Sequence, residues 1–252
     1  MQNLGYCSVC GEVRNLEGIC IHDHECIVQP NGVTDLIEKN KFVKYPRTLH
    51  LPWSKGFTSD DKVLKSVDCF VGKEVVVTEK MDGENTTLYS DHVHARSIDS
   101  KNHPSRNLIK ALHASIADMI PWGWRICGEN LFAKHSIHYH NLPSTFLVFG
   151  VYTQFNDCLP WDQTVRMCEM FGLSTVPVLY SGIWDEKAIK KCWTGKCSYS
   201  SDDEQEGYVV RNAGEFKSTQ HQVNVGKFVR KNHIQTDEHW LSQAIVKNKV
   251  KT

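Results

Sequence analysis

Short apolar runs separated by polar turn residues recur through this 252-residue chain. The runs have strand length, and strands are predicted at 74–78, 86–89, 93–95, 124–128, 145–152, 207–211 and 223–230. Amphipathic spacing and cap residues predict helices at 105–120, 162–171, 185–193 and 237–246. Because strands outnumber helices and lie in hairpin-like pairs, the pattern predicts an α+β fold. Its antiparallel sheets would be flanked by helices, unlike a doubly wound parallel sheet.

Composition places the chain among globular proteins without a membrane segment. Charged residues make up 23% of the chain and hydrophobic residues 40%. The longest clean apolar stretch, 146–152, is too short to cross a bilayer, and the first six residues lack the features of a signal peptide. We therefore expect a cytoplasmic protein. The net charge is zero, but basic residues concentrate at 96–110 and 217–251, which leaves room for a local nucleic-acid groove.

The first 30 residues differ from the rest in carrying four of the ten cysteines. Cys7 and Cys10 have zinc-knuckle spacing, and a tetrahedral zinc site needs two further ligands. The candidates for these are Cys20, His22, His24 and Cys26. We predict a structural zinc ion bound by Cys7, Cys10, Cys20 and Cys26, with His24 as the main substitute. Residues 1–30 then form a zinc-binding segment and residues 31–252 the main domain.

A lysine follows the first predicted strand, in the hexapeptide Lys80-Met81-Asp82-Gly83-Glu84-Asn85. A lysine at the edge of a strand presents its amine to a cleft. There, desolvation or neighbouring positive charge can make the amine nucleophilic. The hexapeptide is only moderately specific when taken alone, since an Asp-Gly pair after a strand also forms an ordinary hairpin turn.

Four further stretches follow the hexapeptide in order, RICGENL (125–131), FLVFGVY (146–152), EGYVVR (206–211) and GKFVRK (226–231). With KxDGxN at Lys80 they resemble the ordered motifs of the lysine nucleotidyltransferases, which include DNA ligases, RNA ligases and mRNA-capping enzymes. The phrases KYPRTLHLPWS, GENLFAKHSIHY and KFVRKNHIQTDEHW resemble the ATP-dependent RNA ligases of the second phage type and their bacterial relatives. The resemblance covers roughly residues 40 to 240 and implies an ATP-grasp-like adenylation domain.

This resemblance implies roles for three catalytic residues. Lys80 would attack the α-phosphate of ATP, Glu206 would bind Mg²⁺ or Mn²⁺, and Lys227 would contact the α-phosphate. The last motif often has a second basic residue two places after its lysine, where this chain has Val229. Arg230 is the preferred substitute, ahead of Lys231.

The same resemblance assigns nucleotide-binding residues. Glu79 would help to read the adenine edge, while Asn85 and Arg96 would line the nucleotide and phosphate side. Glu129 would hold the ribose hydroxyls, and Phe149 would stack on adenine. Each of these residues taken singly has an ordinary structural explanation, and the ordered set favours the functional one.

The sequence therefore predicts an ATP-dependent RNA ligase that acts on nicked or broken RNA ends. Two alternatives stay open: a ligase for nicked DNA or RNA–DNA hybrids, and a ligase-like module that binds RNA ends without sealing them. The chain stops at Thr252, so we expect no C-terminal OB-fold. Recognition of the ends would then come from the N-terminal segment, the basic face or a protein partner.

Overall fold

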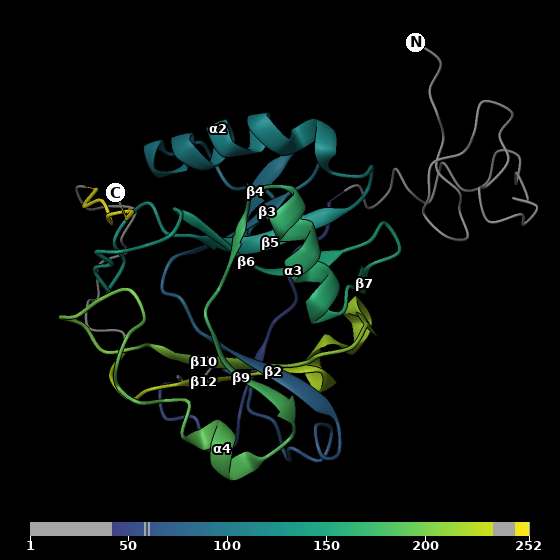
Figure 1. The fold of residues 1–252 in the computed structure, drawn as a ribbon, viewed down its shortest axis with the longest axis vertical. Coiled ribbons are helices and arrows are strands. Elements are labelled where there is room, and N and C mark those ends of the chain that lie inside the picture. Colours follow the sequence, from purple (N-terminus) through teal and green to yellow (C-terminus); the bar gives the residue numbers. More distant parts are fainter. Residues whose placement is uncertain (1–41, 58, 60, 234–244, 252) are drawn as a thin grey trace, which may run out of the picture. The chain divides into compact units, whose positions relative to one another are not determined.

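The structure is a computed structural model that describes residues 42–57, 59, 61–233 and 245–251 (Figure 1). Residue contacts divide the chain into Met1–Val43 and Lys44–Thr252, and the fold below is that of the second unit. The predicted zinc ligands Cys7, Cys10, Cys20 and Cys26 lie outside the described residues, as does the predicted boundary at residue 30. Both stay predictions.

Two β-sheets form the framework of the Lys44–Thr252 unit. The first has five strands in the order β1 (Leu49–His50), β12 (Val225–Val229), β10 (Gly207–Asn212), β2 (Glu74–Glu79) and β9 (Val178–Ile183). Neighbouring strands in this sheet are antiparallel, except that β1 and β12 pair in parallel. This sheet carries Lys80 at the end of β2 and Lys227 within β12.

The second sheet has seven strands. Six lie in the order β11 (Phe216–Lys217), β7 (Asp157–Cys158), β6 (Phe146–Tyr152), β5 (Arg125–Asn130), β3 (Glu84–Leu88) and β4 (Val93–Ala95). The seventh, β8 (Ser174–Thr175), pairs in parallel with β6. This sheet carries Asn85, Glu129 and Phe149.

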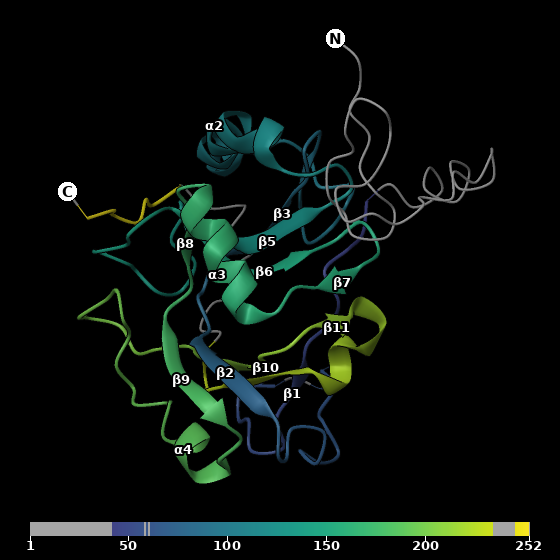
Figure 2. The same cartoon turned by 45° about the vertical axis from the view of Figure 1, so that its right-hand side comes forward.

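Helices cover the outer face of each sheet (Figure 2). The seven-stranded sheet packs against α2 (Asn107–Ile116) and α3 (Trp161–Met170) through a buried apolar cluster that includes Leu88, Val148 and Ile109. The five-stranded sheet packs against α4 (Glu186–Lys190), whose Ile189 is fully buried with Val75 and Tyr208. Burial of each large apolar side chain contributes about 1.5–3 kcal/mol. The inner faces of the sheets also meet in buried clusters, which include Val76 of β2 with Leu147 of β6 and Val225 of β12 with Cys127 of β5. No helix in the described part of the chain is long and apolar enough to span a membrane.

Most predicted elements are present, and the α+β class is confirmed. The helix predicted at 105–120 is α2 between two 3₁₀ turns, η1 (Pro104–Arg106) and η2 (Ala117–Met119); a third, η3 (Ser218–Val223), precedes β12. The helix predicted at 237–246 falls mostly outside the described residues, and its last two residues are not helical. Strand β9 was not predicted. Pro177 before it and Gly182 within it are signals of a loop.

The hairpin interpretation of Lys80–Asn85 is wrong. Strands β2 and β3 belong to different sheets, so residues 80–83 cross from one sheet to the other. Gly83 does not have a positive φ. A Cβ there would lie 2.6 Å from the Asn130 carbonyl oxygen and 3.0 Å from Glu129 Cγ, so glycine is needed for close approach to β5. The crossover places Lys80 at the boundary between the sheets.

The segment 247–251 is hydrogen-bonded to the loop 131–142 through the side chain of Asn248. The Asn248 amide group donates to the carbonyls of Leu131 (2.8 Å) and Ala133 (3.3 Å), and its oxygen accepts from the Tyr139 amide at 2.9 Å. The side chain is buried. The loop 131–142 also supplies the hydrogen-bond donors that orient Asp82. The segment 247–251 therefore stabilises the position of Asp82 indirectly, through this loop.

We expect Asn248→Ala to lower the free energy of unfolding by about 2–4 kcal/mol, because it leaves buried backbone groups of Leu131 and Tyr139 without partners. Urea unfolding followed by circular dichroism measures the change. Lys249→Ala, at an exposed neighbouring position, is the control and should cost less than about 0.5 kcal/mol. Equal effects of the two substitutions would contradict the assignment.

Candidate active site

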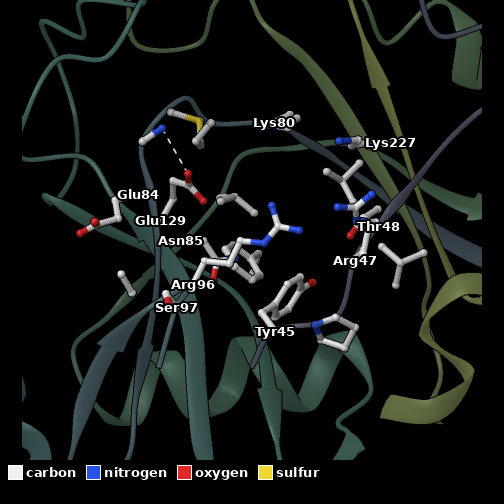
Figure 3. A pocket seen from close by; sticks show the side chains of 18 of the residues that line it. Tyr45, Arg47, Thr48, Lys80, Glu84, Asn85, Arg96, Ser97, Glu129 and Lys227 are labelled. Atoms are coloured by element: carbon white, nitrogen blue, oxygen red, sulfur yellow. Dashed lines mark hydrogen bonds between the residues drawn. The ribbon is translucent and has the colours of Figure 1, made fainter. Parts of the chain in front are cut away.

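A cavity of about 940 Å³ lies between the inner faces of the two sheets (Figure 3). Its size is that of a site for a drug-sized or larger ligand. The predicted residues that line it are Glu79, Lys80, Asn85, Arg96, Glu129, Phe149 and Lys227. Glu206 lies behind this lining and contacts Lys80. Residues far apart in the sequence are thus brought together as the ordered motifs predicted.

Arg230 is placed differently from this set. It is not among the residues that line the cavity, and its guanidinium lies 3.7 Å from Glu204. On strand β12 the cavity is lined by Val225 and Lys227. The structure therefore does not bring Arg230 to the cavity, and a nucleotide contact by this residue stays a prediction.

Lys80 is held by Glu206. Its ammonium lies 2.7 Å from Oε1 and 2.8 Å from Oε2 of that carboxylate, and the Lys80 amide donates to the Gly207 carbonyl. Burial lowers the pKa of Lys80, but Glu206, Glu129 and Asp82 together outweigh it, so the pKa is raised. Without ligand the lysine is therefore an ammonium ion.

Glu129 lies beside this pair, on β5. Its Oε1 accepts from the Gly83 amide at 3.2 Å, the contact drawn in Figure 3. Burial raises the pKa of Glu129 to about 8, with Glu206 and Asp82 adding to the rise and Lys80 opposing it. Carboxyl groups thus crowd the region around Lys80. The predicted contact between Glu129 and ribose hydroxyls remains a proposal.

A β-bulge at Phe149 brings Tyr152 to the same face of β6 as Phe149, towards the cavity. Cys127 pairs with Gly150 but Gly128 pairs with Val148, so Phe149 is the extra residue on β6. Without the bulge, strict alternation would place residues 148 and 152 on one face. With it, Val148 and Val151 face the helices while Phe149 and Tyr152 face the cavity. The Phe149 ring is half-buried and available for stacking. Tyr45 packs edge-on against it, with the two ring centroids 5.0 Å apart.

Four basic side chains converge on the cavity from different elements. Arg96 follows β4 and reaches into the cavity, while Arg47 lies with Lys227 on the other side (Figure 3). Burial, followed by Lys80, lowers the pKa of Lys227. Together with Lys80 these residues form an anion-binding wall, which suits a polyphosphate or a nucleic-acid phosphate.

Asn85 and Glu79 differ in whether their side-chain oxygens already accept hydrogen bonds within the protein. Asn85 lines the cavity, and its buried Oδ1 has no hydrogen-bond partner, so it is available to a ligand donor. The carboxylate of Glu79 instead accepts from the amide and hydroxyl of Ser198. A contact between this carboxylate and adenine would have to replace or share those bonds.

Sequence reasoning missed several residues of the site. Tyr45 lies on the cavity floor, and Asp61 lies 3.8 Å from Lys227. Asp82 was part of the lysine signature but had no assigned role. His233 lies in the stretch KFVRKNHIQTDEHW but had no assigned role, and its ring lies between Asp82 and Glu206. These three form a candidate metal-binding group.

His221, which is buried next to Thr48 and Tyr152, predicts an acid-sensitive contribution to stability. Burial, followed by Arg211, lowers its pKa to about 3, and its Nε2 lies 3.0 Å from the Thr48 hydroxyl. An unfolded histidine binds its proton near pH 6.5, so the folded state loses stability as pH falls from 6.5 towards 3.

Between pH 7 and pH 5, we expect the free energy of unfolding of His221→Gln to fall by about 2 kcal/mol less than that of the wild type. Urea unfolding at the two pH values gives the difference, with His140→Gln as the control because that histidine is half-exposed. The same acid-induced loss in His221→Gln and wild type would contradict the expectation.

Comparison with known proteins agrees with this fold. A Naegleria gruberi RNA ligase with PPi is similar at a TM-score of 0.51 and 16% identity, over 75% of this chain and 57% of that chain. An archaeal ATP-dependent RNA ligase is similar at a TM-score of 0.51 and 17% sequence identity, over 75% of this chain and 48% of that chain. The chain thus spans about half the length of these structures. No curated protein matches it. The family model described as RNA ligase matches residues 73–229, well over half of the chain. The chain therefore belongs to the RNA ligase family.

Proposed function

We propose that this protein is an ATP-dependent RNA ligase that adenylates itself on Lys80. The observation that carries the proposal is the position of the Lys80 amine. It lies between Glu206 and a cavity that also contains Lys227, Asn85 and Phe149. Membership of the RNA ligase family supports it, as does the fold shared with an archaeal ligase described as ATP-dependent.

In the first step the Lys80 amine forms a bond to the α-phosphorus of ATP, and the bond to the β-phosphate oxygen breaks. Pyrophosphate leaves, and AMP stays on the lysine as a phosphoramidate. Lys227 would stabilise the charge that develops on the α-phosphate, and Phe149 would stack on adenine. The unpartnered Oδ1 of Asn85 would accept a hydrogen bond from the nucleotide.

A divalent cation fits the carboxylates near Lys80, with Glu206 as a ligand. When bound, it would neutralise phosphate charge and withdraw charge from Glu206. The Lys80 ammonium could then lose its proton, which it must do before the attack. This accounts for a lysine whose pKa is raised when no ion is bound.

In the later steps AMP passes from Lys80 to an RNA 5′-phosphate, and a 3′-hydroxyl then attacks that phosphate and releases AMP. Arg47 and Arg96 on the cavity wall offer charge for the incoming phosphate. The test of the first step is incubation with ATP labelled at the α-phosphate. We expect covalent label that is stable to alkali and labile to acid, and none from γ-labelled ATP. Absence of label from α-labelled ATP refutes the proposal.

Sealing assays decide between the candidate substrates. Matched nicked duplexes of RNA, DNA and RNA–DNA hybrid are compared in one experiment. We expect RNA to be sealed fastest. Equal sealing of the DNA nick would support a general nick ligase. Covalent label without sealing of any substrate would support an end-binding module that depends on a partner.

We also propose that the N-terminal segment binds zinc through Cys7, Cys10, Cys20 and Cys26, with His24 as the substitute ligand. The spacing of the first pair supports this. Metal analysis of the purified protein is expected to find about one zinc ion per chain, and less in Cys7→Ser. Zinc-free wild-type protein would refute it.

A further inference from the structure

Lys227 has an acidic neighbour that the proposed mechanism does not use. Asp61 lines the same cavity, and its Oδ1 lies 3.8 Å from the Lys227 ammonium nitrogen. Both side chains are half-buried, so the pair is partly shielded from water. At this distance the carboxylate attracts the ammonium without forming a hydrogen bond to it. The contact therefore leaves the three N–H donors of the lysine to a ligand.

The backbone holds Asp61 beside strand β1. His50 in β1 pairs with Lys227 in β12. On the side away from β12, the His50 amide donates to the Lys62 carbonyl and the His50 carbonyl accepts from the Leu64 amide, each at 2.8 Å. These bonds keep Asp61 within reach of both the His50 ring and the Lys227 ammonium.

The imidazole of His50 contacts the same oxygen of Asp61. Its Nε2 lies 3.4 Å from Asp61 Oδ1, and its Nδ1 lies 2.8 Å from the Ser54 hydroxyl oxygen. Burial, followed by Lys227, lowers the pKa of His50 to about 4, so the ring is neutral near pH 7. A neutral ring has one N–H group, and the carboxylate favours the tautomer with that group at Nε2. His50 therefore directs its N–H to Asp61 and restricts the movement of the carboxylate.

The sequence of contacts from Ser54 through His50 to Asp61 resembles the triad of a hydrolase, but its hydroxyl is not accessible. Ser54 is buried, and its oxygen accepts from the Val229 amide at 3.0 Å. Neither Ser54 nor His50 lines the cavity, whereas Asp61 does. The arrangement therefore acts at the cavity through Asp61, and the cation that it contacts there is Lys227.

The surroundings of Lys227 make a fixed negative charge necessary. The cations Lys80 and Arg96 and the anions Asp61 and Glu206 all act on its ammonium. Burial, followed by Lys80, lowers the pKa of Lys227, while Asp61 and Glu206 oppose this change. Only the protonated lysine can stabilise the negative charge that develops on a phosphate.

We propose that Asp61, fixed by His50, is a positioning residue that keeps Lys227 charged and directed into the cavity. Glu206 contacts the other lysine, Lys80, at 2.7 Å, so each of the two lysines has its own carboxylate. That Lys227 serves nucleotide transfer rests on the proposed function, whereas the hold of Asp61 on Lys227 does not.

The first test observes Lys227 in the full chain without nucleotide. Protein with ¹³C-labelled lysine is titrated with alkali, and the Lys227 side-chain signal is identified by its loss in Lys227→Arg. We expect a lower midpoint pH for this signal in Asp61→Asn, because a neighbouring carboxylate favours the ammonium form. Asp61→Glu keeps the charge and should have a midpoint closer to that of wild type. Asp68→Asn is the control, since that exposed carboxylate contacts Ser66, and it should leave the midpoint unchanged.

The second test measures the rate at which α-labelled ATP labels the protein in a single turnover. We expect Asp61→Asn to slow label formation at saturating ATP about 5–10-fold, with a smaller change in the ATP concentration for half-maximal rate. In the Lys227→Ala background the same substitution should change the rate by less than about 2-fold, because it acts through that lysine. A general structural defect would instead slow both backgrounds equally.

An unchanged midpoint in Asp61→Asn, equal slowing in both backgrounds, or faster labelling overturns the proposal. If Asp61→Asn fails to fold, Asp61→Ser is measured in its place. The two tests also separate this proposal from the proposed function. Wild-type protein that takes no label refutes the ligase function, while a lowered midpoint still supports the hold of Asp61 on Lys227. Label with an unchanged midpoint leaves the ligase function standing and removes the role of Asp61.

Discussion

Replacement of Lys80 by alanine is expected to abolish covalent labelling by α-labelled ATP, because the attacking amine is removed. The rate of RNA sealing from ATP should fall by at least about 10⁴-fold. Lys80→Arg should also lack label, since a guanidinium keeps its proton near neutral pH. The pair of variants therefore separates the nucleophile from the positive charge that contacts Glu206.

The control for Lys80 lies at the opposite end of the same strand. Lys73→Ala removes an exposed lysine directly before β2, whereas Lys80 directly follows it, and this variant should label like wild type. RNA that already carries a 5′-adenylate bypasses the first step, so Lys80→Ala should still seal it. Label on Lys80→Ala would show that another residue is the nucleophile. Loss of sealing with adenylated RNA would show that the variant is damaged more widely.

Lys227→Ala has the second largest expected effect. Its side chain lines the cavity and is 22% exposed, so its charge acts in a partly desolvated environment, where electrostatic interactions are strong. We expect the rate of label formation at saturating ATP to fall by about 10²–10³-fold, with a smaller change in the ATP concentration for half-maximal rate.

Lys217→Ala is the matched control, because that lysine is 67% exposed and pairs with Asp157. It should change the rate of label formation by less than about 2-fold. Lys227→Arg tests geometry, since it keeps the charge with a larger head group, and partial activity is expected. If Lys227→Ala changed only the ATP concentration for half-maximal rate, the residue would bind ATP without stabilising the transfer.

Strands with a continuous apolar run could be located from the sequence. Val75, Val76 and Val77 in β2 are all buried, and the run is uninterrupted. Strand β9 could not be located in this way. Its side chains are mostly exposed or half-buried at the edge of the sheet, so burial imposes no clear pattern on its residues.

The order of the motifs predicted which residues meet, but not how they meet. Phe149 and Tyr152 both face the cavity because of a bulge at Phe149, and nothing in FLVFGVY marks the extra residue. The Asp-Gly pair is ambiguous in sequence, since close approach and a tight turn both call for glycine. His233 lies far from Asp82 in the chain, so their proximity is a product of tertiary packing alone.

The crossover at residues 80–83 has a mechanical consequence. It is a short connection between two strands, and it joins the sheet that carries Lys227 to the sheet that carries Phe149. Any rocking of one sheet against the other would change the reach of the Lys80 amine. A nucleotide that contacts both sheets would restrict this movement. Binding of the nucleotide would therefore fix the position of the Lys80 amine relative to it.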